Sequence, residues 1–289
     1  MNRENLTRYA WLSIGAAVLT IALKAAAYWF TGSVGLLSDA LESLINLAAA
    51  IVALFTLKIA AQPADEDHAF GHDKAEYFSS GIEGTLIFIA ALSIAYTAFQ
   101  RLFAPQPIEQ IGVGLLVSGV ATAVNLSVAQ ILLRAGKTHH SLVLEADGHH
   151  LMTDVWTSVG VVIGVGLVNL TGWLRLDPIV AILVAVNIIW TGFGLIKRSV
   201  LGLMDTVVAP EIQTVAENIL KNCAEKEGIT YENFRSRQSG VKKYFYVDMQ
   251  FPNDWSISKV HEIADRTELE IQEKIPNAIV FTHLEPFDK

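Results

Sequence analysis

Two pairs of polar residues, each four positions apart, interrupt long apolar stretches of this chain. Glu42 and Asn46 form the first pair, and His150 and Asp154 form the second. Residues four positions apart share one face of a helix. Ionisable side chains are costly in hydrocarbon and usually face a partner, a cavity or an ion. Two helices that present these pairs to each other can surround a divalent cation.

The four side chains make a mixed ligand set of two carboxylates, one amide oxygen and one imidazole. Such a set suits tetrahedral zinc, and because it is rich in oxygen it also suits Fe(II), Co(II) or Mn(II). Asp39 lies three residues before Glu42 on the same helix face, where it can assist ion entry or support the ligands. Polar contacts between packed helices are the alternative, but two pairs that each contain an acid favour an ion site.

Other polar residues in the apolar stretches favour a structural interpretation. Lys24, Glu83 and Asn125 can pair with neighbours or face a cavity. His149 adjoins His150 but points about 100° away around a helix, so we do not expect it to bind the same ion.

A second cluster of possible ligands lies in the polar segment 62–74. Asp65, His68 and His72 can converge on one metal ion, and Gly71 permits a tight turn between them. A solvated acidic loop is the alternative interpretation, and the spacing alone does not decide between the two.

The C-terminal part carries a more scattered set of acids and histidines. His283 and Glu285 share one strand face because side chains alternate along a strand, and Glu232, Asp248 and His261 lie in nearby predicted elements. Spread-out groups of this kind are usually solvated surface. The lone Cys223 excludes an intramolecular disulfide and a cysteine-rich zinc module.

The apolar residues that position the first two pairs are concentrated in the first 200 positions. Hydrophobic residues make up 52% of the chain and charged residues 17%, and the mean hydropathy is +0.40. Stretches near the roughly 20 residues needed to cross a bilayer predict six transmembrane helices, at 9–30, 33–60, 79–103, 110–134, 144–170 and 177–200.

Basic residues in the short connections predict the orientation of these helices. Only Arg101 and Arg175 fall on the outer side if both termini lie in the cytoplasm, and the positive-inside rule favours that arrangement. The inner side then holds Arg3, Arg8, Lys58, Lys74, Arg134, Lys137, Lys197 and Arg198. The net charge of −8 gives no indication of nucleic-acid binding.

The pattern changes after residue 203, where charged residues become frequent. Helical spacing predicts helices at 210–225 and from Ser256 or Ser258 to Lys274. Strands are predicted at 231–237, 244–251 and 278–283, which gives the order α-β-β-α-β. Phe245, Val247 and Met249 would form the buried face of the middle strand. We therefore predict a transmembrane domain at 1–203 and a small α+β cytoplasmic domain at 204–289, which dimerisation would help to stabilise.

Several segments together resemble the cation diffusion facilitator family of divalent-metal/proton antiporters, most closely its bacterial ferrous-iron/zinc efflux branch. The resemblance covers nearly the whole chain. The segments that carry it are Gly35-Leu-Leu-Ser-Asp-Ala-Leu-Glu42, Phe70-Gly-His-Asp-Lys-Ala-Glu76, Ala146-Asp-Gly-His-His-Leu-Met-Thr-Asp154, Leu176-Asp-Pro178 and Arg235-Ser-Arg-Gln-Ser-Gly240.

This resemblance implies a six-helix membrane domain with a ferredoxin-like cytoplasmic domain, working as a homodimer. It places the transport site at Glu42, Asn46, His150 and Asp154 and a loop site at Asp65, His68 and His72. It places a binuclear cytoplasmic site at Glu232, Asp248, His261, His283 and Glu285. It also pairs Lys74 with Asp205 in a charged contact that holds the dimer together.

The chain departs from the family pattern at several ligand positions. Asn46 stands where relatives carry an acid, Glu232 and Asp248 where close relatives carry histidine, and Glu285 where they carry aspartate. Replacing imidazole by carboxylate shifts preference from zinc towards harder ions such as Mn(II) or Fe(II).

The function that this resemblance implies is export of Zn(II), Fe(II) or Mn(II), with Cd(II), Co(II) and Ni(II) as further candidates, in exchange for protons across a bacterial inner membrane. Alternating access would expose the site to each side in turn, and His150, Glu42 and Asp154 would carry the protons. A membrane-anchored metal sensor without transport is the alternative. A metalloenzyme is disfavoured because the chain lacks a His-Glu-x-x-His motif.

Overall fold

The computed structural model describes residues 6–31, 34–104 and 113–287. The chain divides between Val200 and Leu201 into an N-terminal helical unit and a C-terminal unit that contains a sheet.

Long helices account for most of the described N-terminal unit, and their bounds agree with the six predicted stretches to within a few residues, except at one helix end. The predicted starts at 33 and 110 lie outside the described residues. The helices are α1 (Thr7–Thr31), α2 (Val34–Ala60), α3 (Ala75–Phe103), α4 (Val113–His139), α5 (Leu142–Thr171) and α6 (Leu176–Leu203). We expected the loop after the fourth helix to begin at 135, but α4 continues to His139 and ends where His140 adopts a positive φ of 52°. Lys137 and His139 lie in its last turn, where cations interact favourably with the helix dipole.

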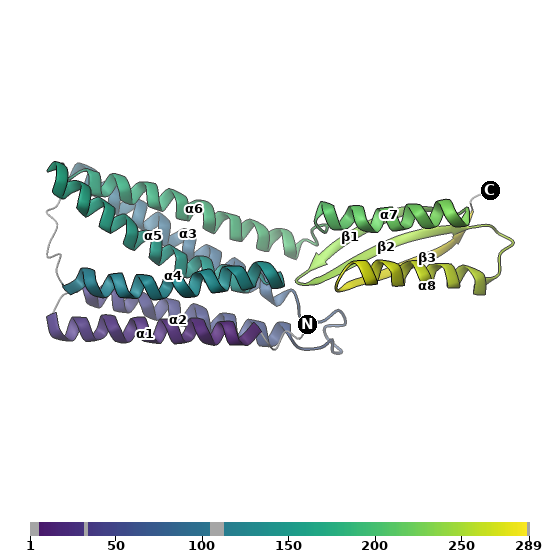
Figure 1. Ribbon diagram of the computed structural model, residues 1–289, viewed down its shortest axis with the longest axis horizontal. Helices are drawn as coiled ribbons and strands as arrows, with labels where there is room; N and C mark the ends of the chain where they lie inside the picture. The colour runs from purple at the N-terminus through teal and green to yellow at the C-terminus, as the bar shows by residue number, and fades with distance from the viewer. Residues whose placement is uncertain (1–5, 32–33, 105–112, 288–289) are drawn as a thin grey trace. The chain divides into compact units, whose positions relative to one another are not determined.

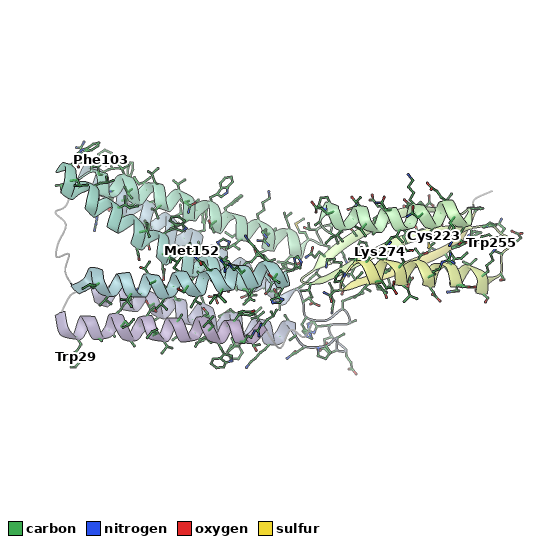
Figure 2. The ribbon with its side chains drawn as sticks, viewed as in Figure 1. Trp29, Phe103, Met152, Cys223, Trp255 and Lys274 are labelled. Carbon is green, nitrogen blue, oxygen red and sulfur yellow. The ribbon has the colours of Figure 1, made fainter. Side chains whose placement is uncertain are left out.

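Four of these helices contain, within the described residues, segments long and apolar enough to cross a membrane: Thr7–Ala26, Ala75–Phe103, Gly119–His139 and Pro178–Leu203. Large apolar side chains such as Leu183 and Trp190 are exposed on them, which suits a lipid environment better than water. Figure 2 shows Trp29 and Phe103 at the ends of α1 and α3, a common position for aromatic residues at a membrane surface.

The helices of this unit pack around two apolar clusters that share α5. One cluster joins α1, α2, α4 and α5 through residues such as Leu57, Leu132 and Leu151, and the other joins α3, α5 and α6 around Ile87 and Ile188. Figure 1 shows α1, α2 and α4 side by side, with α3, α5 and α6 as a second group. Since α5 contacts α2, α3 and α4, its polar residues are placed between the two groups.

The C-terminal unit has the predicted order of helices and strands. Its elements are α7 (Pro210–Glu227), β1 (Thr230–Ser239), β2 (Lys242–Phe251), α8 (Ile257–Lys274) and β3 (Ala278–Pro286). The sheet order is β1-β2-β3, with β1 antiparallel and β3 parallel to β2. Phe245, Val247 and Met249 are buried as predicted, in a core to which α7 and α8 both contribute. Tyr246 and Asp248 lie on the opposite, open face of β2 by strand alternation.

Candidate functional site

The structure joins the second and fifth helices through three of the four predicted transport ligands. Nε2 of His150 lies 2.7 Å from Oδ1 of Asn46, and Nδ2 of Asn46 donates to Oδ2 of Asp154 at 2.5 Å. Asn46 is 4% exposed and His150 9%. Glu42 and Asp39 belong to α2, but their side chains lie outside what the structure describes. The amide of Asn46 therefore sits between the imidazole and the carboxylate.

A fourth side chain joins this group from α4. Nδ2 of Asn125 donates to the same oxygen of Asp154 at 3.2 Å, so that two amides from two helices hold one carboxylate. Asn125 is 4% exposed, and its Oδ1 has no hydrogen-bond partner among the described residues. The sequence favoured a structural role for Asn125, but its contact places it at the site. We call Asn46, Asn125, His150 and Asp154 the helix cluster.

His150 also has a ring nitrogen without a partner. Its Nδ1 is buried and forms no hydrogen bond within the described part of the chain, while Nε2 faces Asn46. An unsatisfied buried nitrogen beside an amide and a carboxylate is costly unless something binds there. A proton or a metal ion satisfies such a group, and the helix cluster offers both nitrogen and oxygen donors for either.

The predicted loop residues converge. Oδ1 of Asp65 lies 3.1 Å from Nδ1 of His68, Oδ2 of Asp65 lies 3.3 Å from Nε2 of His72, and the two imidazole rings have centroids 4.4 Å apart. One ligand atom from each residue lies within 4.8 Å of the others. Gly71 adopts a φ of 86°, which permits the turn that the sequence predicted. Among the described residues this loop cluster is the one group of three or more acids and histidines gathered so closely.

The geometry also keeps the loop carboxylate ionised. The backbone N–H of His68 donates to Asp65 at 2.7 Å, and this hydrogen bond lowers the pKa of the Asp65 carboxyl group below its usual value. The lowered pKa leaves an anionic oxygen available beside two imidazoles over a wide pH range.

The C-terminal candidates align across the sheet without gathering around a point. Asp248 is in register with both Glu232 and His283, and Gln250 with Glu285. Asn233 donates to Asp248 and Gln250 donates to Glu232, each at 2.7 Å, while His283 lies 3.3 Å from Glu285. His261 lies exposed on α8. We call Glu232, Asp248, His283 and Glu285 the sheet-face group.

Asp205, one half of the predicted charged pair, has a partner within its own unit. Nη1 of Arg237 donates to Oδ1 of Asp205 at 3.0 Å. Lys74 precedes α3 in the other unit, so its pairing with Asp205 stays a prediction.

Comparison with known proteins identifies relatives over nearly the full chain. The family model for the cation efflux transmembrane domain matches residues 10–204, and that for the cation efflux protein cytoplasmic domain matches residues 209–287. A protein named uncharacterized transporter sll1263, from Synechocystis sp., is 48% identical over 97% of this chain and 90% of its own length. The cation-efflux pump FieF of Klebsiella pneumoniae is 28% identical over 97% of this chain and 93% of its own.

Among solved structures, the putative zinc transporter CzrB matches with 16% identity over 28% of this chain and 99% of that chain. The TM-score of 0.27 is too low to support a conclusion about the fold.

Proposed function

The chain belongs to the cation efflux family, also called the cation diffusion facilitators, whose members are membrane transporters and not enzymes. On that basis we propose that the protein exports a divalent transition metal in exchange for protons. The observation that carries the proposal is the helix cluster, in which Asn46, His150 and Asp154 meet although more than 100 residues separate Asn46 from the other two. Glu42, one turn before Asn46 on α2, completes the proposed transport site.

In this proposal α1 to α6 all cross the bacterial inner membrane, with both termini in the cytoplasm. Residues 1–203 form the transport domain. Residues 204–289 form a ferredoxin-like domain through which two copies of the chain dimerise, as the matching cytoplasmic family model suggests. The Lys74–Asp205 pair is proposed to hold the dimer together. The sheet-face group and His261 are proposed as a binuclear, regulatory metal site.

The metal is proposed to be Zn(II), Fe(II) or Mn(II). The oxygen-rich ligand set supports the harder ions of this group, because imidazole and thiolate favour zinc more strongly than carboxylate and amide do. The loop cluster is proposed as a second metal site, since its three side chains already lie at distances that one ion can bridge.

Energetics favour coupling to protons. Export of two charges against a potential of about 100 mV costs ~4.6 kcal/mol, because each charge costs ~2.3 kcal/mol. Each proton that enters returns about half of that electrical work. Asn46 does not titrate, so His150, Asp154 and Glu42 are the proposed proton carriers at the transport site.

The test is pH-driven uptake of Zn(II), Fe(II), Mn(II), Co(II), Ni(II) and Cd(II) by proteoliposomes, comparing the natural chain with Asn46→Asp. We expect flux that favours Mn(II) or Fe(II) and shifts towards Zn(II) or Cd(II) in the variant. His150→Ala and Asp154→Asn should lose proton flux. Unchanged proton flux in both variants would contradict the coupling, and no flux for any ion in the natural chain would favour the sensor.

A further inference from the structure

A second buried polar group lies beside the helix cluster and has no part in the function proposed above. Glu83 on α3 and Asp147 on α5 are each 1% exposed. Oγ of Ser79 donates to Oε1 of Glu83 at 3.2 Å, and Oγ of Ser13 donates to Oδ1 of Asp147 at 3.1 Å. The second oxygens, Oε2 of Glu83 and Oδ2 of Asp147, are buried and have no partner among the described residues.

The two carboxyl groups lie on neighbouring helices, since α3 and α5 contact each other. Among the described residues no lysine, arginine or histidine forms an ion pair with either one. Two ionised carboxylates without a cation are strongly unfavourable in a low-dielectric interior. Protonation of one relieves the repulsion and supplies an O–H donor for an unpaired oxygen of the other.

Other charged groups on the surrounding helices are engaged elsewhere. Glu145 on α5 pairs with Arg198 of α6, and Lys24 on α1 donates to Ser43 of α2. His150 faces Asn46. The carboxyl group of Glu76 on α3 accepts a hydrogen bond from Ser141 at 2.8 Å. None of these charged groups therefore neutralises Glu83 and Asp147. A proton is small enough to neutralise them in a site that the hydroxyl groups of Ser79 and Ser13 already line.

The positions of these residues form a route. Glu76, Ser79 and Glu83 recur at helical spacing along one face of α3, beginning in its first turn. Asp147 lies three residues before His150 and therefore on the same side of α5. The buried polar side chains thus extend from the first turns of α3 and α5 to the level of the helix cluster.

We propose that Glu83 and Asp147 share a proton and form a relay station between the transport site and the cytoplasmic ends of α3 and α5. A proton leaving the transport site binds to the pair, and the proton that the pair already held passes by way of Ser79 and Glu76 to the cytoplasm, so protons balance. The direction of this relay rests on the proposed antiport, whereas the shared proton does not.

Infrared difference spectroscopy of the full chain in detergent tests the shared proton without any transport. We expect a band of a protonated carboxylic acid, sensitive to H/D exchange, that is lost in Glu83→Gln and in Asp147→Asn. It should persist in Glu273→Gln, the matched change at an exposed carboxylate of α8, and return in Glu83→Asp. A spectrum of the natural chain without the band at neutral pH would overturn the proposal, whether or not the variants fold.

Proteoliposomes then test the relay. In Glu83→Gln we expect metal affinity at the transport site to be retained while the metal flux loses most of its dependence on internal pH. Full retention of that pH dependence would overturn the relay. Loss of the infrared band on titration with Mn(II) or Zn(II), together with fewer ions bound by Glu83→Gln, would assign the pair to a metal ion instead. Absence of all metal flux, with the band present, would contradict the proposed function but not the shared proton.

Discussion

At the scale of single residues, Asn46 determines how the helix cluster is connected. Its carbonyl oxygen faces the imidazole of His150 while its NH₂ group donates to Asp154. An aspartate at this position offers no donor, so it would repel the Asp154 carboxylate unless a metal ion or a proton lies between them. An asparagine here thus holds the site together without adding a negative charge.

Asn125 gives the first prediction at this scale. Asn125→Ala removes one of the two amide donors to Asp154, and a hydrogen bond to a charged group contributes about 1.5–3 kcal/mol. We expect metal affinity to fall about tenfold or more with the proton count per ion unchanged, measured by calorimetry and by proteoliposome flux. Asn187→Ala, at an exposed position of α6, is the control and should leave affinity unaltered. Equal effects of the two changes would mean that Asn125 does not support the site.

At the scale of elements, the loop between α2 and α3 holds an ionised carboxylate beside two imidazoles. The pKa of the Asp65 carboxyl group is lower in the folded protein than in the unfolded chain. The ionised carboxylate therefore stabilises the folded state above the unfolded pKa, and this contribution is lost only as the pH falls through the lower pKa of the folded state.

We therefore expect Asp65→Asn to weaken metal binding by the loop cluster, because the change removes the anionic ligand. Co(II) absorption spectroscopy on the full chain with His150→Ala, which removes the competing transport site, measures this loss. His68→Ala and His72→Ala should abolish the loop signal at pH 7.5. Full binding by Asp65→Asn would show that the two imidazoles hold the ion without the carboxylate.

The contact between α3 and α6 gives a prediction about packing. A Cβ at Gly192 would lie 3.0 Å from the carbonyl oxygen of Gly84 and 3.0 Å from the backbone nitrogen of Phe88, whereas a Cβ at Gly194 meets nothing within 4 Å. Gly192→Ala should cost about 1–3 kcal/mol through overpacking. Gly194→Ala should stabilise α6 by about 0.5–1 kcal/mol, because alanine loses less entropy in a helix. Unfolding in detergent compares the two, and equal stabilities would contradict this packing.

At the scale of the whole molecule, no helix of the C-terminal unit covers the second face of the sheet within the described residues of that unit. Tyr246 and Phe281 stack on this face with ring centroids 5.0 Å apart, and Phe281 is 42% exposed. A partly exposed aromatic pair on a small unit suits contact with a second copy of the chain.

We expect the natural chain to be a dimer in detergent, and Phe281→Glu to shift it towards monomer, as measured by light scattering after size-exclusion chromatography. Leu269→Glu places the same charge at an exposed position of α8 and should leave the dimer intact. Dissociation by Leu269→Glu alone would place the interface on the helical side of the unit.

The sequence by itself determined the elements and the identity of most candidate ligands. Hydrophobic runs, strand alternation and four-residue spacings are local properties, and they predicted the helices, the order α-β-β-α-β and the convergence of Asp65, His68 and His72 around Gly71. The side chains of Glu42 and Asp39 lie outside the described residues, so their place at the site stays a prediction.

Only the tertiary structure decided which distant polar residues meet. Asn125 reaches Asp154, and Ser13 reaches Asp147 from 134 positions away. Asp147, although part of a quoted motif, carried no separate signal, because a single acid on a helix is equally compatible with lipid-facing, paired and buried positions. Which of these applies depends on the rotation of each helix against its neighbours. That rotation is set by the apolar clusters on both sides of α5, and no local pattern in the chain encodes it.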